Sequence, residues 1–309
     1  MNQADFAGRV ALITGGARGI GRACAEEFYR RGAAVVIVDA GVGIDGSGAD
    51  PSIAQQFAVR LGERALAFTE NLSGSGAAQR AVAVAIEKFG AIDIVVNNAA
   101  ILRDAFIFKA SAQAFENVLA VNLLAPMAVL AAATQHLREQ VKNGRAPGRI
   151  VNMLSSAGLF GNFGQAAYAA SKAGLLGLTR VVAMDLARSK ITCNAVVPFA
   201  ATRVTESIQA ANEAQSLYKE RALSIAPMHV ARLVAALSED ANQVTGQIIG
   251  ARGREVFLFS QPRPVMRATL SRDEPRAAAE LRALLDAQWG AAYTDLTTDL
   301  EFFNTEPAL

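Results

Sequence analysis

Short apolar runs alternate along the chain with longer segments in which apolar residues recur at helical spacing. The runs are rich in β-branched residues, and several lack the alternation of a half-exposed strand, which is typical of parallel strands covered on both faces. They predict strands at Val10–Thr14, Ala34–Asp39, Arg64–Thr69, Ile92–Asn97, Arg149–Leu154, Thr192–Val197 and Gln247–Ile249. The helical segments between and after them are Gly19–Arg31, Pro51–Leu61, Gly76–Phe89, Ala112–Gln140, Gln165–Ser189, Glu206–Ala222 and Met228–Leu237. This order predicts an α/β fold with a doubly wound, parallel, seven-stranded sheet and helices on both faces.

The alternation stops near Gly250, although the chain continues. It has 309 residues, whereas a single domain of this kind usually stops growing near about 250. Beyond that point, apolar residues at helical spacing follow Glu274-Pro275, namely Ala278, Leu281, Leu284, Leu285 and Trp289. We predict one domain over residues 1–255 and a C-terminal arm over residues 256–309 with one amphipathic helix. The arm is expected to pack on the domain or on a neighbouring subunit, and a disordered tail is the alternative.

Composition favours a globular protein that binds a small molecule. Hydrophobic residues make up 52% and charged residues 19% of the chain, which excludes a disordered polymer. Lys plus Arg number 30 and Asp plus Glu number 28. The resulting net charge of +2 does not indicate binding to nucleic acid or to an anionic membrane. We therefore expect neither as a partner.

The cysteines and the first residues of the chain indicate in which cellular compartment the protein is expected. Cys24 and Cys193 lack the paired spacing of a metal site or a disulfide framework, so no metal is expected. The first residues lack the basic and apolar regions of a secretory signal. The longest apolar run, Leu123–Ala133, is too short to cross a bilayer. These features predict a cytoplasmic protein.

A glycine-rich segment follows the first predicted strand and leads into the first predicted helix. Its sequence is Thr14-Gly15-Gly16-Ala17-Arg18-Gly19-Ile20-Gly21. Glycines let the backbone approach a pyrophosphate closely, and the helix N-terminus offers that group free N–H donors and a positive dipole end. The alternative is a tight strand-to-helix turn without a ligand. The flanking strand and helix favour a dinucleotide site.

An acidic residue suggests which dinucleotide is bound. Asp39 stands 18 residues after Gly21, at the end of the second predicted strand. A carboxylate there can accept hydrogen bonds from the adenosine ribose and would repel a 2′-phosphate, which favours NAD over NADP. The alternative for Asp39 is a structural cap. Arg18 could pair with a 2′-phosphate, and its alternative is a solvated surface charge.

A tyrosine, a lysine and a serine form the candidate catalytic group. Tyr168 and Lys172 are four residues apart in a predicted helix and so share one face. Ser155 precedes Tyr168 by thirteen residues and lies at the end of a predicted strand, where open α/β sheets bind ligands. An ammonium beside a phenol is expected to lower the pKa of the phenol, and a serine hydroxyl can polarise the reacting oxygen. The spacing alone is common, and the alternative is a half-buried aromatic ring beside a solvated lysine.

With these motifs in place, the chain resembles the short-chain dehydrogenase/reductase family. The similarity extends from about Gly8 to Gly250. Besides the glycine turn, Ser155 and the Tyr168–Lys172 segment, the matching motifs are Asn71-Leu72, Asn97-Asn98-Ala99-Ala100, Val121-Asn122 and the stretch from Asn194 to Pro198. The resemblance implies a Rossmann fold and hydride transfer between a nicotinamide cofactor and a secondary alcohol or ketone.

The resemblance also implies a role for each matching residue. Asn122, Ser155, Tyr168 and Lys172 would form a catalytic tetrad, in which Asn122 holds a water that connects Lys172 to solvent. The residues expected to contact the cofactor are Gly15, Arg18, Gly19, Ile20, Gly21, Asp39, Asn71, Leu72, Asn98, Ala99, Ala100, Tyr168, Lys172, Pro198 and Thr202. Thr205 is an alternative to Thr202 for this contact.

Two positions depart from the family pattern, which has glycine where this chain has Ala100 and Phe199. Each adds bulk near the expected cofactor, so the local backbone path is expected to shift. Neither change removes a reacting group, and we therefore predict an active enzyme. The alternative that these two residues raise is a nucleotide-binding scaffold without turnover.

Three loop segments carry a narrower resemblance, to the 3-hydroxyacyl-CoA dehydrogenase part of the peroxisomal multifunctional β-oxidation enzyme and its bacterial relatives. They are Ala40–Asp50, Ile101–Asp104 and Gly161–Gln165. This resemblance implies NAD-dependent oxidation of a 3-hydroxyacyl-CoA thioester, steroid and other bulky acyl groups included. Acyl-carrier-protein reductases share parts of these segments, so reduction of a 3-oxoacyl-ACP or of a ketosteroid is the alternative.

Two further expectations concern the substrate pocket and the assembly. Phe160, Phe163 and Phe199 suit an apolar acyl pocket and equally suit core packing. The apolar faces of the helices at Ala112–Gln140 and Gln165–Ser189 exceed what one sheet face needs to cover. In the family such helices pair across a two-fold axis, which implies a homodimer or homotetramer.

Overall fold

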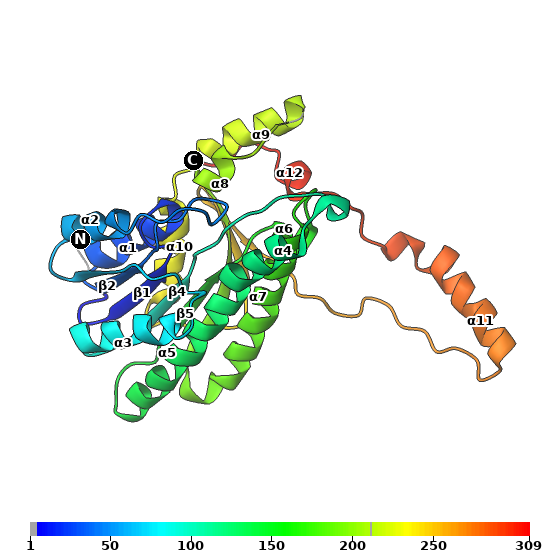
Figure 1. Cartoon of the computed structure of the whole chain (residues 1–309). Helices are drawn as coiled ribbons and strands as arrows, with labels where there is room; N and C mark the ends of the chain where they lie inside the picture. The colour runs from blue at the N-terminus through cyan, green and yellow to red at the C-terminus, as the bar shows by residue number, and fades with distance from the viewer. Residues whose placement is uncertain (1–4, 211) are drawn as a thin grey trace. The chain divides into compact units, whose positions relative to one another are not determined.

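The computed structural model describes residues 5–210 and 212–309, and the chain divides into two compact units. The first unit extends to Phe259 and also contains the end of the chain, Thr298–Leu309, and the second is Ser260–Thr297. The expected boundary after residue 255 falls inside a paired strand of the first unit. Figure 1 shows the elements of both units in chain order.

One sheet of eight strands forms the centre of the first unit, in the order β3-β2-β1-β4-β5-β6-β7-β8. The strands are β1 (Val10–Thr14), β2 (Ala34–Val38), β3 (Ala65–Phe68), β4 (Ile94–Asn97), β5 (Arg149–Met153), β6 (Thr192–Phe199), β7 (Ile248–Arg252) and β8 (Glu255–Leu258). Strands β1 to β7 are parallel, and Ile13 of β1 lies beside Ile37 of β2 and Val96 of β4. The strand order reverses direction between β1 and β4, and ligands bind at such a switch point in open α/β sheets.

The doubly wound fold is confirmed, but the prediction of seven strands is wrong by one. Strand β8 pairs antiparallel with β7, and the two-residue turn between them uses Gly253 at a φ of +61°. Only alternate residues of β8 are covered, with Val256 and Leu258 exposed. Strand β8 carries the consecutive apolar residues Val256, Phe257 and Leu258, but it lies beyond the last βα unit, where the expected alternation of strands and helices stops.

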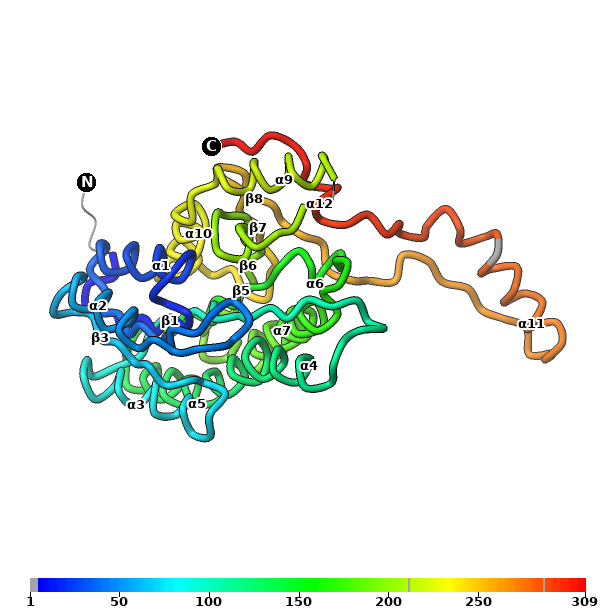
Figure 2. Tube along the Cα trace, turned by 45° about the horizontal axis from the view of Figure 1, so that its top comes forward, coloured from blue at the N-terminus to red at the C-terminus, as the bar shows by residue number. Residues whose placement is uncertain are grey.

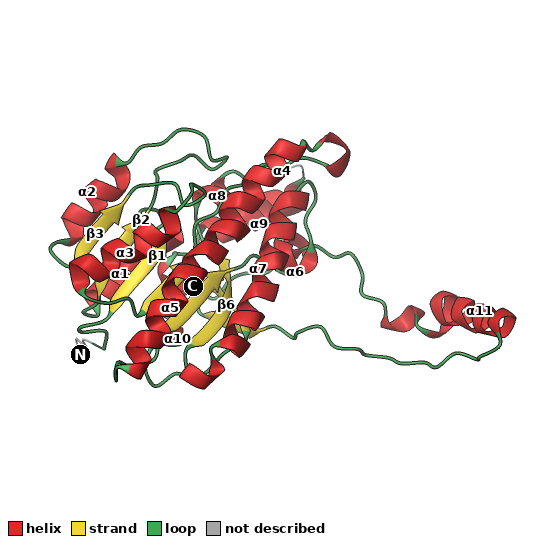
Figure 3. Cartoon of the chain, turned by 60° about the horizontal axis from the view of Figure 1, so that its bottom comes forward, coloured by secondary structure: helices red, strands yellow, loops and turns green. Residues whose placement is uncertain are grey.

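Helices cover both faces of the sheet (Figures 1 and 3). One face is covered by α1 (Gly19–Arg30), α2 (Ser52–Leu61) and α10 (Met228–Ser238), which bury Phe28, Phe57 and Val234. The other face is covered by α3 (Ala77–Phe89), α5 (Ala125–Lys142) and α7 (Ala166–Asp185), which bury residues such as Val82 and Leu137. The continuous apolar strands follow from this arrangement, because neither face of the central strands meets water.

The segment predicted as one helix at Ala112–Gln140 is a helical run with a change of pitch inside it. Helix α4 (Ala112–Leu119) passes through a π-helical turn, η2 (Ala120–Leu124), into α5. The run Ala112–Lys142 is long and apolar enough to cross a membrane by length and composition. Its residues Val129 and Leu137 pack in the core beneath the sheet, which accounts for that apolar character.

The segment predicted as one helix at Glu206–Ala222 is two helices, α8 (Arg203–Glu206) and α9 (Glu213–Leu223). The side chains of Thr202 and Asn212 accept hydrogen bonds from the first turns of α8 and α9, respectively. Two N-caps within ten residues start two helices, whereas apolar spacing alone suggests one. The remaining short helices of the first unit are η1 (Ile107–Lys109), α6 (Ala157–Phe160), η3 (Ala187–Ser189) and α12 (Asp299–Phe302).

The end of the chain is part of the first unit and is held by side-chain contacts. Arg221 of α9 donates to Glu306 over 2.7 Å and to the backbone carbonyl of Asn304 over 3.0 Å. Arg252 of β7 donates to the backbone oxygen of Thr305. Figures 1 and 2 both draw the chain end close to α9. These contacts join the last residues to strands and helices that precede them by many positions.

The second unit, Ser260–Thr297, contains one helical segment. It consists of α11 (Glu274–Ala283), η4 (Leu284–Gln288) and η5 (Gly290–Ala292). The Asp273 side chain caps α11 by accepting from the Arg276 backbone N–H. A helix therefore occupies the region where the sequence predicts an amphipathic one.

Candidate active site

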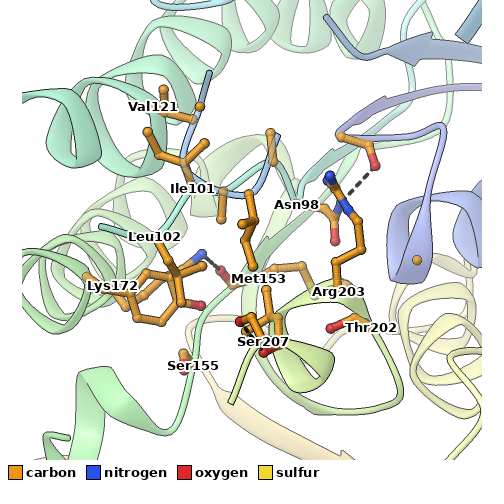
Figure 4. A pocket seen from close by; sticks show the side chains of 18 of the residues that line it. Asn98, Ile101, Leu102, Val121, Met153, Ser155, Lys172, Thr202, Arg203 and Ser207 are labelled. Atoms are coloured by element: carbon orange, nitrogen blue, oxygen red, sulfur yellow. Dashed lines mark hydrogen bonds between the residues drawn. The ribbon is translucent and has the colours of Figure 1, made fainter. Parts of the chain in front are cut away.

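A cavity of about 900 Å³ opens at the carboxyl ends of β1, β2, β4, β5 and β6. Among the predicted site residues, all line this cavity except Gly21 and Asn122, which lie behind its wall. Figure 4 shows Ser155 and Lys172 at one end of the cavity, and Asn98, Thr202 and Arg203 at the other. The structure therefore brings together one group of residues predicted to bind a cofactor and another predicted to react.

The glycine turn packs its backbone more closely than any side chain would allow. A Cβ added to Gly21 would lie 2.1 Å from the Gly15 carbonyl oxygen, and one added to Gly15 would lie 2.9 Å from Ala99 Cα. Gly15 and Gly19 also have φ of +62° and +52°, which favours glycine. Helix α1 begins directly after this turn, without a side-chain cap and without an acidic residue in its first turn. Its free N–H groups and dipole fit a diphosphate, so these residues can hold a dinucleotide.

Asp39 lies at the end of β2 with both carboxylate oxygens facing backbone donors. Its Oδ2 accepts from the Ala17 N–H over 3.1 Å and its Oδ1 from the Gly41 N–H over 2.9 Å. The Arg18 guanidinium lies 3.6 Å from Oδ1. The carboxylate thus connects the glycine turn to the loop after β2 and lines the cavity where an adenosine ribose would lie.

Sequence reasoning missed Arg203, which lies on the same side of the cavity. Arg18 and Arg203 both donate to the Val42 carbonyl oxygen, over 2.8 Å and 3.3 Å. Burial, and then the neighbouring Arg18 charge, lower the pKa of Arg203, whereas Asp39 acts in the opposite direction. Arg203 follows Thr202 in the first turn of α8, and no motif in the sequence marks it as a ligand residue.

The loop after β4 is held against the glycine turn. Thr14 Oγ1 accepts from the backbone N–H groups of Asn98 and Ala99 over 2.9 Å and 3.0 Å. Asn98 Nδ2 donates to the carbonyl oxygens of Thr14 and Gly15 over 2.9 Å and 3.1 Å. The Asn98 side chain is therefore a structural support of the turn, and its residue also lines the cavity.

Tyr168 and Lys172 lie on one face of α7, as predicted, and both are buried. Lys172 Nζ lies 5.6 Å from the centre of the Tyr168 ring and donates to the Met153 carbonyl oxygen over 2.7 Å. Burial lowers the pKa of Lys172 to about 8. The backbone carbonyl of β5 thus fixes the direction of the ammonium group.

The expected lowering of the Tyr168 pKa does not hold in the structure. Burial raises the pKa of Tyr168 to about 12, and a hydrogen bond with Ser155 only partly offsets this effect. The charges of Asp104 and Asp299 raise it further. Desolvation of the phenolate in this buried position is therefore the largest effect on the Tyr168 pKa.

Ser155 follows β5 and faces the same cavity. Its Oγ accepts from the Ala157 N–H over 3.2 Å, which orients the hydroxyl, and it also bonds Tyr168. A hydroxyl held in this way can bind the oxygen of a substrate beside the Tyr168 phenol. The two groups line one cavity and can therefore act together on one substrate oxygen.

Asn122 is fully buried in the π-helical turn η2. Its Oδ1 accepts from the Ile101 N–H over 2.9 Å, and its Nδ2 donates to the Ile101 carbonyl over 3.0 Å and to Ser171 Oγ over 3.3 Å. The side chain thus fixes the loop after the cofactor-lining segment. Its role in holding a relay water stays a prediction.

The three phenylalanines proposed for an acyl pocket have different environments. Phe163 lines the cavity and is 81% exposed, whereas Phe199 lines it from a buried position. The Phe160 ring packs against Phe259, Phe302 and Phe303 at centroid distances of 6.5, 5.5 and 6.1 Å. Phe163 and Phe199 are thus available to an apolar group, while Phe160 belongs to the packing behind it.

The part of the chain that the structure describes holds no cluster of His, Cys, Asp and Glu able to bind a metal. The predicted chemistry uses a phenol, a hydroxyl and an ammonium group. These groups can move a proton and bind an oxygen, and a dinucleotide would accept or donate the hydride.

Comparison with known proteins agrees with this site. Residues 9–215 match the sequence profile of the short chain dehydrogenase family. A crystal structure of a short chain dehydrogenase from Mycobacterium avium superposes with a TM-score of 0.72 at 33% identity, covering 90% of this chain and 95% of that one. Hydroxyacyl-CoA dehydrogenase ChsB1 of Mycobacterium tuberculosis is 37% identical over 84% of this chain and 82% of its own length.

Two further relatives differ in their stated activity. The chain is 34% identical to peroxisomal multifunctional enzyme type 2 of mouse over 78% of its own length, but it spans only 31% of that protein. It is 37% identical to the 3-oxoacyl-[acyl-carrier-protein] reductase FabG of Aquifex aeolicus, over 80% of this chain and 96% of the reductase. With these similarities the chain belongs to the short-chain dehydrogenase/reductase family and is an NAD(P)-binding oxidoreductase that acts on CH–OH groups.

Proposed function

We propose that this enzyme oxidises a 3-hydroxyacyl-CoA thioester with NAD. The observation that carries the proposal is that Ser155, Tyr168 and Lys172 line the same cavity as the glycine turn and Asp39. The named activity of hydroxyacyl-CoA dehydrogenase ChsB1 supports the choice of substrate class.

In the proposed reaction, Tyr168 Oη removes the hydroxyl proton of the substrate as the carbinol becomes a ketone. Ser155 Oγ donates a hydrogen bond to the same oxygen and holds it beside the phenol. Lys172, turned toward the cavity by the Met153 carbonyl, would bond the nicotinamide ribose. When bound, the nicotinamide ring accepts the hydride from the carbinol carbon.

Asp39 supports NAD as the cofactor. Its carboxylate is held at the end of β2 by two backbone N–H groups and lines the cavity there. A 2′-phosphate beside this carboxylate would meet like charge, whereas ribose hydroxyls can donate to it.

A second candidate function is favoured by Arg18 and Arg203. These two guanidinium groups converge on the Val42 carbonyl close to Asp39, and both can pair with a phosphate. If they bind a 2′-phosphate, the enzyme uses NADP and reduces a 3-oxoacyl group, as the name of the Aquifex aeolicus relative states for that protein.

The test is a scan of cofactor reduction with 3-hydroxyacyl-CoA thioesters from short chains to steroid-sized acyl groups, each with NAD and with NADP. We expect turnover with NAD, and we expect the Tyr168→Phe variant to lose roughly a hundredfold or more in kcat while still binding NAD. Faster reduction of 3-oxoacyl-ACP with NADPH would favour the reductase instead. Cofactor binding without turnover of any alcohol would indicate a scaffold.

A further inference from the structure

Asp299, from the end of the chain, lies in the wall of the catalytic cavity. Only 6% of it is exposed, and it lines the cavity together with Ser155 and Tyr168. Its Oδ2 accepts a hydrogen bond from the hydroxyl of Ser156, the residue that follows Ser155. This carboxylate lies outside the segment that matches the family profile, so no role in the shared chemistry accounts for it.

The second oxygen of this carboxylate has no partner. Asp299 Oδ1 is buried without a hydrogen bond, and so is Oδ1 of Asn162, which lines the same cavity. Buried polar atoms are nearly always hydrogen-bonded, because an unpaired one destabilises the folded protein. Both unpaired atoms are acceptors, so a group that donates a hydrogen bond fits this site.

Packing holds Asp299 in place before any substrate arrives. The ring of Phe303, four residues further on, lies 4.5 Å from that of Phe199 and 5.4 Å from that of Phe257. The Thr298 side chain and Glu301 form a capping box around the turn that carries Asp299. A polar group held by such a shell is suited to recognition, because little order has to be gained on binding.

Asp299 is also close enough to act on the reacting phenol. Its charge raises the pKa of Tyr168, and it does the same to Tyr218, which lines the cavity as well. Burial raises the pKa of Asp299 itself, while the hydrogen bond from Ser156 and the nearby Asn162 side chain oppose that rise. A donor from the substrate would favour the ionised form of the Asp299 carboxylate.

We propose that Asp299 is a substrate-recognition residue that accepts a hydrogen bond from an N–H or O–H group of the substrate close to the reacting carbinol. The inference rests on the proposed function, because it assigns the donor to a 3-hydroxyacyl thioester. Two parts of such a substrate carry donors: the amide of the thioester arm, and a second hydroxyl on the acyl chain. Both present the same chemistry to Asp299 Oδ1.

Paired substrates test the inference and separate the two sources. The first pair is the N-acetylcysteamine thioester of 3-hydroxybutyrate and its analogue with an ester oxygen in place of the amide N–H. The second pair is the same thioester with and without a hydroxyl at C4 of the acyl group. We expect wild type to prefer the donor-bearing member of one pair roughly tenfold to a hundredfold in kcat/KM, as for a hydrogen bond to a charged group.

Three variants test whether Asp299 causes that substrate preference. Asp299→Leu keeps a similar shape without an acceptor and is expected to reduce the preference to within about twofold. Ser156→Ala removes the hydrogen bond to Oδ2 but leaves Oδ1, so it should retain the preference. Asp295→Asn changes an exposed carboxylate four residues earlier and should match wild type. Thermal unfolding and NAD titration calorimetry report whether Asp299→Leu remains folded with an intact cofactor site.

The outcomes distinguish the inference from the function on which it rests. Turnover with the same preference in Asp299→Leu as in wild type, or with no preference in wild type, overturns the role of Asp299 alone. Absence of turnover of all these thioesters by wild type, while NAD still binds, overturns the proposed function and the inference with it.

Discussion

The ring of Phe199 lies 4.5 Å from the ring of Phe303, measured between their centroids. Phe199 is the residue that replaces a glycine of the family pattern at the end of β6, and Phe303 comes from the end of the chain. The Phe199 side chain, which a glycine would lack, therefore has a packing partner. Its ring packs on Phe303 and helps to bury the C-terminal segment beside the catalytic cavity. The same contact positions Asp299, which precedes Phe303 by four residues.

This contact predicts that replacing Phe303 destabilises the protein more than replacing its neighbour Phe302. Phe303→Ala should lower the free energy of unfolding by about 3 kcal/mol or more, because it empties a buried aromatic site. Phe302→Ala is the matched control, since Phe302 is 61% exposed, and it should change that free energy by about 1 kcal/mol or less. Urea denaturation measures both. Equal effects would show that the Phe303 contacts do not hold the segment.

Lys172 predicts a pH dependence of stability. Its pKa is lowered by burial from 10.5 to about 8 in the folded protein. Between these values the folded state binds fewer protons than the unfolded state, so the contribution of Lys172 to stability rises with pH. Above about pH 10 the raised pKa of Tyr168 acts in the opposite direction, because the unfolded phenol ionises first.

The measurement for Lys172 is urea unfolding of wild type and of Lys172→Met from pH 7 to pH 10. We expect the stability difference between the two proteins to shift in favour of wild type as the pH rises through this range. A difference that stays constant would contradict a lowered Lys172 pKa. Lys109, an exposed lysine at the end of η1, provides the control substitution to Met.

The raised pKa of Tyr168 predicts that alcohol oxidation speeds up with pH. Because the phenol must lose its proton before it can act as a base, kcat/KM for oxidation should rise across neutral pH and into the alkaline range. Asp299→Asn removes one of the charges that raise this pKa, so its profile should move to lower pH. Coincident profiles for wild type and variant would argue against electrostatic contact between the two residues.

Asp39 and Arg203 predict opposite effects on cofactor choice. Asp39→Ala should weaken NAD binding and improve the ratio of NADP to NAD affinity by roughly tenfold or more, since it removes a ribose acceptor and a repulsive charge. Arg203→Ala should lower the affinity of the enzyme for NADP more than its affinity for NAD. Calorimetric titration with each nucleotide measures these ratios. An NADP preference in wild type that Asp39→Ala leaves unchanged would contradict the role given to Asp39.

The glycine turn predicts a steric effect. Gly21→Ala places a Cβ 2.1 Å from the Gly15 carbonyl oxygen, so the turn must move and nucleotide affinity should fall strongly. Gly177→Ala in α7 is the control, because a Cβ there meets no atom within 4 Å. It should leave nucleotide affinity unchanged and raise stability by about 0.5–1 kcal/mol through higher helix propensity. Nucleotide titration and thermal unfolding distinguish the two variants.

The sequence by itself determined the features that depend on local chemistry. Continuous β-branched runs predicted the strands, the four-residue spacing put Tyr168 and Lys172 on one helix face, and glycines marked a turn that the structure shows at positive φ. Each of these signals lies within a few residues of the feature it predicts, because backbone conformation and side-chain direction are set locally. The same holds for the position of Asp39 after its strand.

Only the tertiary structure decided how the site is completed and what burial does to it. Asp299 meets Ser156 across 143 residues of chain, and Phe303 packs on Phe199 across 104 residues, so no local pattern indicates either contact. The upward direction of the Tyr168 pKa also follows from burial, which spacing on a helix cannot reveal. Desolvation and long-range packing depend on which distant segments exclude water from a group, and that is settled only when the whole chain is folded.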